Sequence, residues 1–344
     1  MTLANLAFAV PGKITNLTGG TIYDRRVIEE LRRLGTNVEH IELPGGFPTP
    51  SDAEMKAALG ALHTVPRDVP LIIDGLAFGA MDGVESIASP LYPLVHHPLA
   101  EERGLEAGLQ QDLFQTERRN LACARHVIVP SPHTKSLLTD RYGVAHDAIT
   151  VARPGTDRPE RTPAPTAPPL ILAVGIQLPR KGHDILLQAL SQITDLEWTA
   201  TIAGKALDQQ YAKTLTRLKA SNGLDSRITL AGEVERANLD DLYAKASLFA
   251  LASRYEGYGI VFDEALVRGL PIVASGAGAV ADTVPPEAGL VVPPDDPHAF
   301  AGALREMLSA RDLMKAKAKA ALRAGQTLPE WSQTAATIAA ALNR

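Results

Sequence analysis

The sequence predicts an α/β protein made of two doubly wound domains. Three observations lead to this prediction: short apolar runs alternate with helical patterns, a proline-rich segment interrupts them near the middle, and the alternation then starts again. The chain has 344 residues, of which 45% are hydrophobic. That length exceeds one ordinary core and fits two domains of about 150 residues each. We therefore expect two parallel sheets, each covered by helices on both faces.

The first half of the chain carries the first set of elements. Apolar runs typical of strands lie at 6–10, 37–43, 70–74, 92–97, 126–131 and 148–154. Amphipathic patterns over 23–35 and 109–124 fall between some of them. Short apolar strands separated by helices favour a parallel sheet that is buried on both faces.

A linker separates the two halves. Prolines are dense over 158–169, and such composition gives a semi-rigid connection without helix or strand. We place the first domain at 1–157, the second at 170–327, and a final helix at 328–344.

The second half repeats the alternation. Strands are expected at 170–175, 198–204, 227–232, 247–253, 271–275 and 288–294, and helices at 183–193, 208–221 and 237–246. From Pro297 onward the chain has a helical pattern, and the Lys/Ala-rich run 314–325 is typical of a solvated helix face.

Composition excludes several classes of function. The formal net charge of −5 gives no basic field for nucleic acid or an anionic membrane. Cys123 is the only cysteine, in a helical pattern where we expect it to be buried, and a reducing cytoplasm suits such a chain. The apolar residues 1–10 read as a buried strand, and no run reaches the roughly 18 apolar residues of a membrane span. We expect a cytoplasmic protein with at most peripheral contact at the inner membrane face.

The most informative motif spans Glu256 and Glu264. Seven residues separate these glutamates across a glycine-punctuated turn that follows the strand at 247–253. Backbone N–H groups of Gly257, Tyr258 and Gly259 at a helix start suit an anion, and the carboxylates can accept hydrogen bonds from sugar hydroxyls. The alternative is that Glu256 is a solvated loop residue and Glu264 a first-turn helix acid.

A pair of cations follows the first strand of the second domain. Arg180 and Lys181 lie shortly after Gly175, where a forked guanidinium and a compact ammonium can neutralise a diphosphate. The same sheet edge is expected to carry the glutamate motif. The alternative is a solvated pair in a loop.

Two features of the first domain could face a ligand. Gly19 and Gly20 follow the first strand and allow close backbone approach at a helix start, although a plain tight turn explains them equally well. His96 or His97, at a strand end, could hydrogen-bond a sugar hydroxyl or take part in proton transfer, or have a structural role only. Because adjacent strand residues point to opposite faces, shared metal ligation by the two histidines is disfavoured.

Taken together, the GG turn, the strand-end histidine, the PG-x-D segment, the RKG loop and E-x₇-E resemble the retaining GT-B glycosyltransferases of family four across nearly the whole chain. The stretch YEGYGIVFDEALVRGLPIVAS carries most of this resemblance. The resemblance implies two Rossmann-like domains facing across a cleft, with the C-terminal helix returning toward the first domain.

The resemblance also implies roles for single residues. Glu256 would contact a donor-sugar hydroxyl and Glu264 the ribose, Lys181 and Arg180 would hold the diphosphate, and His96 would face the donor. The remaining donor-binding positions are Gly20, Gly175, Val234, Gly257, Tyr258, Gly259 and Ile260. Many members have arginine where this chain has Ile176, which suggests a rearranged diphosphate clamp, and no role is carried onto Asp282.

The implied activity is transfer of a hexose, with retention, from a UDP- or GDP-linked donor to a hydroxyl acceptor such as a glycan, a lipid or a small molecule. No carboxylate pair that would flank the reaction centre is evident, and the resemblance implies front-face displacement without a covalent side-chain intermediate. No DxD-like metal pair stands at a strand end, so we expect neither metal nor cofactor. The acceptor would enter past Gly19, Gly20, His96 and the segment 99–108. Arg118, Arg119 and Arg125 are expected on a solvated helix face, the alternative being a basic surface for a lipid-linked acceptor. The alternative functions are a sugar-nucleotide epimerase or hydrolase and a non-catalytic nucleotide-sugar-binding subunit.

Overall fold

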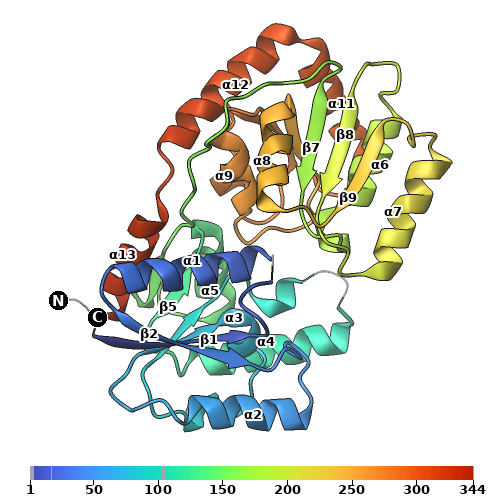
Figure 1. Ribbon diagram of the computed structural model, residues 1–344. Coiled ribbons are helices and arrows are strands. Elements are labelled where there is room, and N and C mark those ends of the chain that lie inside the picture. Colours follow the sequence, from blue (N-terminus) through green and yellow to red (C-terminus); the bar gives the residue numbers. More distant parts are fainter. Residues whose placement is uncertain (1–3, 17, 103–104, 344) are drawn as a thin grey trace. The chain divides into compact units, whose positions relative to one another are not determined.

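The computed structural model describes residues 4–16, 18–102 and 105–343, and the chain divides into two compact units (Figure 1). The first unit comprises Met1–Gly155 with Pro329–Arg344, and the second comprises Thr156–Leu328. Each unit contains a six-stranded parallel sheet with helices packed against it. The predicted α/β fold class is confirmed.

The sheet of the first unit has the strand order β2-β1-β3-β4-β5-β6. Its strands are β1 (Asn5–Pro11), β2 (Asn37–Leu43), β3 (Leu71–Asp74), β4 (Leu91–Leu94), β5 (Val127–Val129) and β6 (Ile149–Val151). Its helices are α1 (Gly19–Arg33), α2 (Asp52–Leu62), α3 (Gly75–Phe78), α4 (Ala107–Leu121), α5 (Pro132–Tyr142) and α13 (Trp331–Leu342), with short 3₁₀ turns η1 (Val84–Ser86), η2 (Leu99–Glu101) and η3 (His146–Ala148). All six strands expected from the sequence are present.

The C-terminal helix α13 is part of the first unit. The Thr334 hydroxyl donates to the Arg153 carbonyl over 2.7 Å, and Tyr92 of β4 donates to the Leu342 carbonyl over 3.3 Å. Gly155 makes the close approach possible, because a Cβ there would lie 2.2 Å from the Trp331 backbone nitrogen. The expected return of the last helix toward the first domain is therefore confirmed.

The sheet of the second unit has the order β12-β11-β10-β7-β8-β9. Its strands are β7 (Leu170–Val174), β8 (Thr199–Ala203), β9 (Ile228–Gly232), β10 (Leu248–Leu251), β11 (Ile272–Ser275) and β12 (Gly289–Val292). Its helices are α6 (His183–Ser191), α7 (Gln209–Ser221), α8 (Arg236–Lys245), α9 (Ile260–Leu266), α10 (Val280–Thr283), α11 (Pro297–Ser309) and α12 (Arg311–Gln326), and the 3₁₀ turn η4 covers Pro179–Lys181.

Alternation along the strands of the second unit builds a core on each face of its sheet. Ile171 and Ala173 of β7 pack with residues of α6 and α11, whereas Leu172 between them packs with residues of α8 and α9. Successive strand side chains point to opposite faces, so an unbroken apolar run is what a sheet covered on both faces requires.

Two details adjust the expectations from sequence. Cys123 is exposed, not buried, because α4 ends at Leu121 and the buried positions Asn120 and Leu121 precede it. The segment 158–169 forms no helix or strand, but it is tied to the second unit where Ala164 N donates to the Ala244 carbonyl over 2.7 Å. Among the described residues, no helix has both the length and the apolarity needed to cross a membrane.

Candidate functional site

The strand order of the second unit brings the two strongest sequence motifs together. The chain runs outward from β7 through β8 to β9, then crosses back to β10, which pairs with the other side of β7. In open α/β sheets, ligands bind beyond the carboxyl ends of strands at such a switch point. The RKG loop follows β7, and Glu256 follows β10.

The RKG loop is held against the end of β10 by Gly182. This glycine has φ of +61°, and a Cβ on it would lie 1.8 Å from the Ala252 carbonyl oxygen, so the position requires glycine. Arg254 N donates to the Arg180 carbonyl over 2.7 Å. The two segments therefore lie side by side, and their side chains meet.

Arg180, Lys181 and Glu256 form what we call the Glu256 cluster. Lys181 Nζ donates to both carboxylate oxygens of Glu256, over 2.7 and 3.0 Å, and the Arg180 guanidinium lies 3.8 Å from the same carboxylate. The Ser253 hydroxyl donates to Glu256 Oε1 over 2.6 Å. The side chain of Glu256 is only 4% exposed, and those of Arg180 and Lys181 are 14% and 13% exposed.

The electrostatics of the Glu256 cluster favour ionised groups. Burial alone would raise the pKa of Glu256, but the charges of Lys181 and Arg180 outweigh burial and hold the pKa below its usual value. Within the cluster itself, two cations face one carboxylate. Of the two interpretations of Arg180 and Lys181, the solvated pair is wrong, because both side chains are largely buried.

The glycine-rich turn after Glu256 is largely buried and leads directly into helix α9. Helix α9 begins at Ile260, with Gly259 at φ of +90° as its N-cap. Gly257 and Tyr258 are buried, and the Tyr258 hydroxyl donates to Asp263 Oδ2 over 2.6 Å. Gly175 lies beneath the Lys181 side chain, since a Cβ on it would be 3.4 Å from Lys181 Cδ.

Glu264 belongs to a different set of contacts. It lies in the fifth position of α9, not in the first turn, because the helix starts earlier than the run EALVRG suggested. Its carboxylate accepts from Arg236 over 2.6 Å and from the Tyr243 hydroxyl over 2.9 Å. Val234 is half-buried in the loop between β9 and α8, next to Glu233, which pairs with Lys205 over 3.4 Å.

Sequence reasoning missed Arg254, which organises the RKG loop. Its guanidinium donates to the Asp184 carboxylate over 2.9 and 2.7 Å, to Asp295 over 2.5 Å and to the Pro179 carbonyl over 2.5 Å. These partners lie far away in the chain, so no local pattern could have revealed them. Arg254 thus fixes both ends of the loop that carries Arg180 and Lys181.

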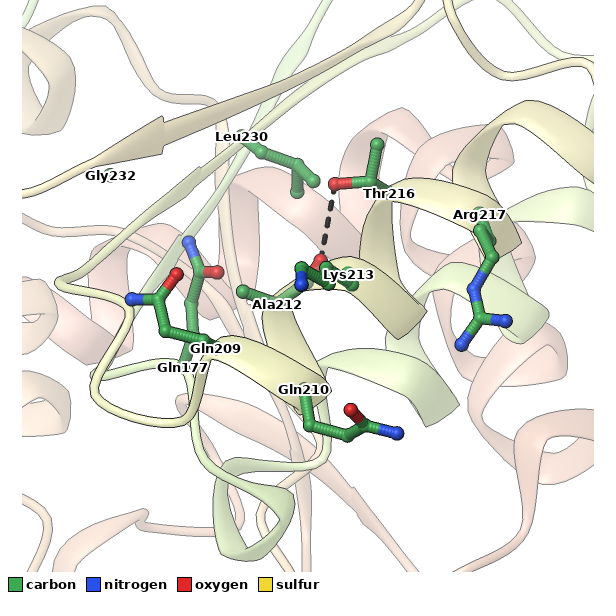
Figure 2. A pocket seen from close by; sticks show the side chains of 9 residues that line it. All are labelled: Gln177, Gln209, Gln210, Ala212, Lys213, Thr216, Arg217, Leu230 and Gly232. Carbon is green, nitrogen blue, oxygen red and sulfur yellow. Dashed lines mark hydrogen bonds between the residues drawn. The ribbon is translucent and has the colours of Figure 1, made fainter.

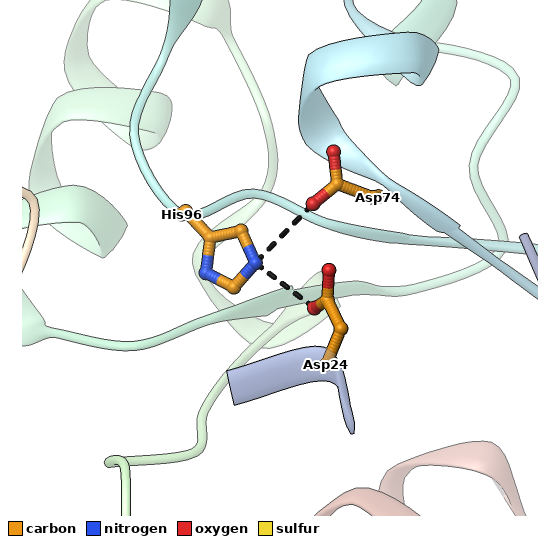
Figure 3. Close-up of side chains that lie close together, drawn as sticks. All are labelled: Asp24, Asp74 and His96. Atoms are coloured by element: carbon orange, nitrogen blue, oxygen red, sulfur yellow. Dashed lines mark hydrogen bonds and ion pairs between the residues drawn. The ribbon is translucent and has the colours of Figure 1, made fainter. Parts of the chain in front are cut away.

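The first unit gathers a second group of ionisable side chains, which we call the His96 cluster: Asp24, Asp74 and His96 (Figure 3). Asp24 lies in α1 after β1, Asp74 ends β3, and His96 follows β4. His96 Nε2 is 3.0 Å from Asp24 Oδ1 and 3.3 Å from Asp74 Oδ2. This is again a switch point, because β2 and β3 flank β1 on opposite sides.

Gly20 and Tyr23 confine the His96 ring. A Cβ on Gly20 would lie 3.1 Å from His96 Cδ2, whereas one on Gly19 would meet no atom within 4 Å. The Tyr23 ring contacts the imidazole edge-on, with centroids 5.2 Å apart. Gly20 therefore makes room for His96, which is a use of the GG turn that sequence reasoning did not foresee.

Burial and charge act against each other in the His96 cluster. Burial would lower the pKa of His96, but Asp24 and Asp74 raise it to about 10. Burial raises the pKa of Asp24 to about 7, against the opposing influence of His96. Burial also acts to raise the pKa of Asp74, but hydrogen bonds and charge from His96 keep it below its usual value.

His97 and the segment 99–108 lie beside this cluster in the sequence. His97 contacts Glu102 over 3.1 Å, away from the partners of His96. The Leu99 N–H donates to the buried Glu117 carboxylate over 2.9 Å, which anchors the start of the segment. Arg103 and Gly104 lie outside the described residues.

The three arginines considered for a lipid-linked acceptor, Arg118, Arg119 and Arg125, are all exposed, and Arg119 pairs with Asp82 over 2.7 Å.

A hollow of about 750 Å³ opens elsewhere in the second unit, between α7 and the edge strand β9 (Figure 2). Its lining consists of Gln177, Gln209, Gln210, Ala212, Lys213, Thr216, Arg217, Leu230 and Gly232. Neither the Glu256 cluster nor Glu264 contributes to this lining. We therefore take the two clusters at the switch points as the candidate functional residues.

The strand orders define a pair of Rossmann-like α/β domains, and each domain carries a charged cluster at its switch point. Residues 156–324, nearly all of the second unit, match the family model described as Glycosyl transferases group 1. This match confirms the resemblance to the glycosyltransferases of family four noted from the sequence.

Two curated relatives illustrate the similarity. The chain is 28% identical over 240 residues to a D-inositol 3-phosphate glycosyltransferase of Xylanimonas cellulosilytica, covering 64% of this chain and 57% of the relative. It is 30% identical over 206 residues to a GDP-mannose-dependent alpha-(1-6)-phosphatidylinositol monomannoside mannosyltransferase of Mycobacterium tuberculosis, covering 53% of this chain and 52% of the relative. The aligned part thus spans just over half the length of each relative.

Among solved structures, the sucrose-phosphate synthase of Thermosynechococcus elongatus superimposes with a TM-score of 0.82 over 97% of both chains, at 22% identity. At that identity the likeness concerns the fold alone. It supports the expected GT-B type of fold, with two Rossmann-like domains.

Proposed function

We propose that this protein is a retaining glycosyltransferase that moves a hexose from a UDP- or GDP-linked donor to a hydroxyl acceptor. The observation that carries the proposal is the Glu256 cluster, where two largely buried cations and one carboxylate lie beyond the carboxyl ends of β7 and β10. Two largely buried cations side by side at a switch point suit an anionic group such as a diphosphate.

The residues of the cluster suggest how transfer would proceed. Lys181 and Arg180 would hold the diphosphate and stabilise the negative charge that develops on it as the bond to the sugar breaks. Glu256 orients Lys181 through two hydrogen bonds, and its carboxylate would accept a hydrogen bond from a sugar hydroxyl. Because side chains supply the positive charge, we propose that transfer needs no metal ion.

Glu264 and Val234 would serve the nucleoside. Glu264 is the carboxylate proposed for the ribose, and its contacts with Arg236 and Tyr243 hold it in one place before the donor arrives. Val234, in the loop after β9, would lie beside the base. The names of the curated relatives include inositol phosphate and a lipid-linked mannoside, so we propose an acceptor hydroxyl on a polyol or sugar, free or lipid-linked. The proposed location is the cytoplasm, with peripheral membrane contact when the acceptor is lipid-linked.

A donor screen tests the proposal. Calorimetry with a panel of UDP- and GDP-sugars identifies the donor, and product analysis with cell extract as the acceptor source detects transfer and the anomeric configuration of the product. We expect transfer with retention, unchanged by a chelator. Donor turnover without acceptor would instead indicate a hydrolase or epimerase, and binding without any transfer would indicate a non-catalytic subunit.

A further inference from the structure

We propose that Asp24 and Asp74 are positioning residues that hold His96 in a single orientation with its Nε2 protonated, so that Nδ1 is the atom of the ring that meets the substrate. The identity of that substrate rests on the proposed function, but the state of the ring does not. The proposal gives a role to two buried carboxylates that the transfer chemistry leaves unused.

Hydrogen-bond chemistry fixes the proton on Nε2. Both atoms near Nε2 are carboxylate oxygens, at 3.0 Å for Asp24 and 3.3 Å for Asp74. Asp74, whose pKa is held low, stays ionised and only accepts hydrogen bonds, so Nε2 must donate. Figure 3 shows Nδ1 on the opposite side of the ring from both carboxylates.

The carboxylates are themselves held in place. Asp74 caps helix α3, with Oδ1 accepting from the Leu76 N–H over 2.7 Å while Oδ2 faces His96. The Asp24 side chain is fully buried in α1, one residue after Tyr23, whose hydroxyl donates to the Ala152 carbonyl over 2.8 Å. Gly20 and Tyr23 close on the ring itself, so the imidazole has little room to rotate.

The charges around the ring determine whether Nδ1 is a hydrogen-bond donor or a base. The ionisable groups that face the ring are Asp24 and Tyr23 on α1 and Asp74 at the end of β3. The two carboxylates raise the pKa of His96 to about 10, so both ring nitrogens carry protons at neutral pH. His96 therefore acts as a cationic hydrogen-bond donor to a substrate oxygen, and not as a base in proton transfer.

The group of this cluster that titrates near neutral pH is Asp24. Its pKa is raised to about 7 by burial, whereas that of Asp74 is held low by His96. Below that pH the cluster is neutral overall, and above it the two carboxylates outnumber the imidazolium. A pH dependence near neutrality would belong to the three groups of the His96 cluster together.

Nitrogen NMR of histidine-labelled protein tests this directly and needs no substrate. The His96 resonances are assigned by their loss in His96→Gln. We expect both ring nitrogens to stay protonated from pH 6 to pH 9, and we expect His183 to stay neutral over the same range because burial lowers its pKa to about 4. In Asp74→Asn the pKa of His96 should fall by about one to three pH units, since one opposite charge is lost.

Three results would overturn the proposal: titration of His96 below pH 8 in the unchanged protein, an unprotonated Nε2, or an unshifted His96 in a folded Asp74→Asn variant. A fourth is that added Zn²⁺ or Mn²⁺ binds stoichiometrically and displaces the Nε2 proton, which would make the cluster a metal site. The measurement on the unchanged protein stands even if Asp74→Asn fails to fold. Failure of glycosyl transfer in the donor screen would leave these resonances untouched, so the two proposals can fail separately.

Discussion

The two clusters have opposite compositions at equivalent places in the two sheets. In the first unit two carboxylates hold one imidazole, and in the second unit two cations hold one carboxylate. Each cluster lies beyond the carboxyl ends of strands at a switch point. The same architecture thus presents an excess of acidic groups in one unit and of basic groups in the other.

Two buried histidines show how strongly the surroundings of an imidazole determine its pKa. His96 faces two carboxylates and its pKa rises to about 10, whereas His183 at the start of α6 contacts the Gly175 carbonyl over 3.0 Å and burial lowers its pKa to about 4. Both follow strands of similar character. Their charge is set by the side chains that the fold brings to them, which a sequence pattern around each histidine does not contain.

The largest expected effect comes from removing the central cation of the Glu256 cluster. Lys181→Met leaves Glu256 buried without its main partner, and the free energy of unfolding should fall by about 3–5 kcal/mol. The double variant Lys181→Met/Glu256→Gln should recover part of the loss. Urea unfolding measures both variants, and Arg161→Met, which removes an exposed ion pair with Asp241, serves as a control with little expected change. Equal stability of Lys181→Met and the unchanged protein would show that the ion pair between Lys181 and Glu256 does not stabilise the fold.

A second prediction is that the two units lose stability on opposite sides of neutral pH, the first unit on the basic side. The pKa of His96 is raised from 6.5 to about 10, so its stabilising contribution is fully present below pH 6.5 and is lost as the pH rises toward 10. The pKa of Glu117 is raised by burial to about 8, which acts in the same direction up to that pH. The first unit should lose about 1.4 kcal/mol per pH unit for each of these two protons between pH 7 and pH 8, and for the proton of His96 alone between pH 8 and pH 9.

The second unit should respond on the acid side instead. The pKa of His183 is lowered from 6.5 to about 4, so its contribution is present above pH 6.5 and is lost as the pH falls from 6.5 toward 4. The chain has two tryptophans, Trp331 in the first unit and Trp198 in the second, both buried. Unfolding followed by fluorescence in Trp198→Phe and in Trp331→Phe therefore reports each unit by itself. Identical pH profiles for the two variants would contradict the comparison.

The smallest expected effect concerns the two adjacent glycines of α1. In Gly20→Ala the new Cβ would press on the His96 ring at 3.1 Å and shift it against its carboxylates, so the His96 resonances should change. Gly19→Ala meets no atom within 4 Å and should leave them unchanged, while stabilising the helix by up to about 1 kcal/mol. If both substitutions shifted the resonances alike, close packing of Gly20 on the ring would not be the cause.

The sequence was sufficient to predict the fold and the Glu256 cluster, but not the carboxylates of the His96 cluster. Apolar runs and their spacing predicted the strands, and two motifs that each follow a strand predicted the meeting of Lys181 and Glu256. Asp24 was not found because it lies among several other charged residues of an amphipathic helix, and only the fold, which brings α1 close to His96 after β4, gives it a partner. Asp74 is the last residue of the strand predicted at 70–74, and an aspartate at a strand end was a local signal that could have identified it.

We propose that the Glu256 cluster of the second unit holds the diphosphate of the donor. The most direct test is calorimetry of UDP and GDP against UMP and GMP, with the unchanged protein and with Arg180→Met. We expect the cognate diphosphate to bind about 10- to 100-fold more tightly than its monophosphate, and this preference to shrink in the variant because a charge-assisted contact is lost. Equal affinities for mono- and diphosphate, or a preference that survives in Arg180→Met and in Lys181→Met alike, would contradict the account.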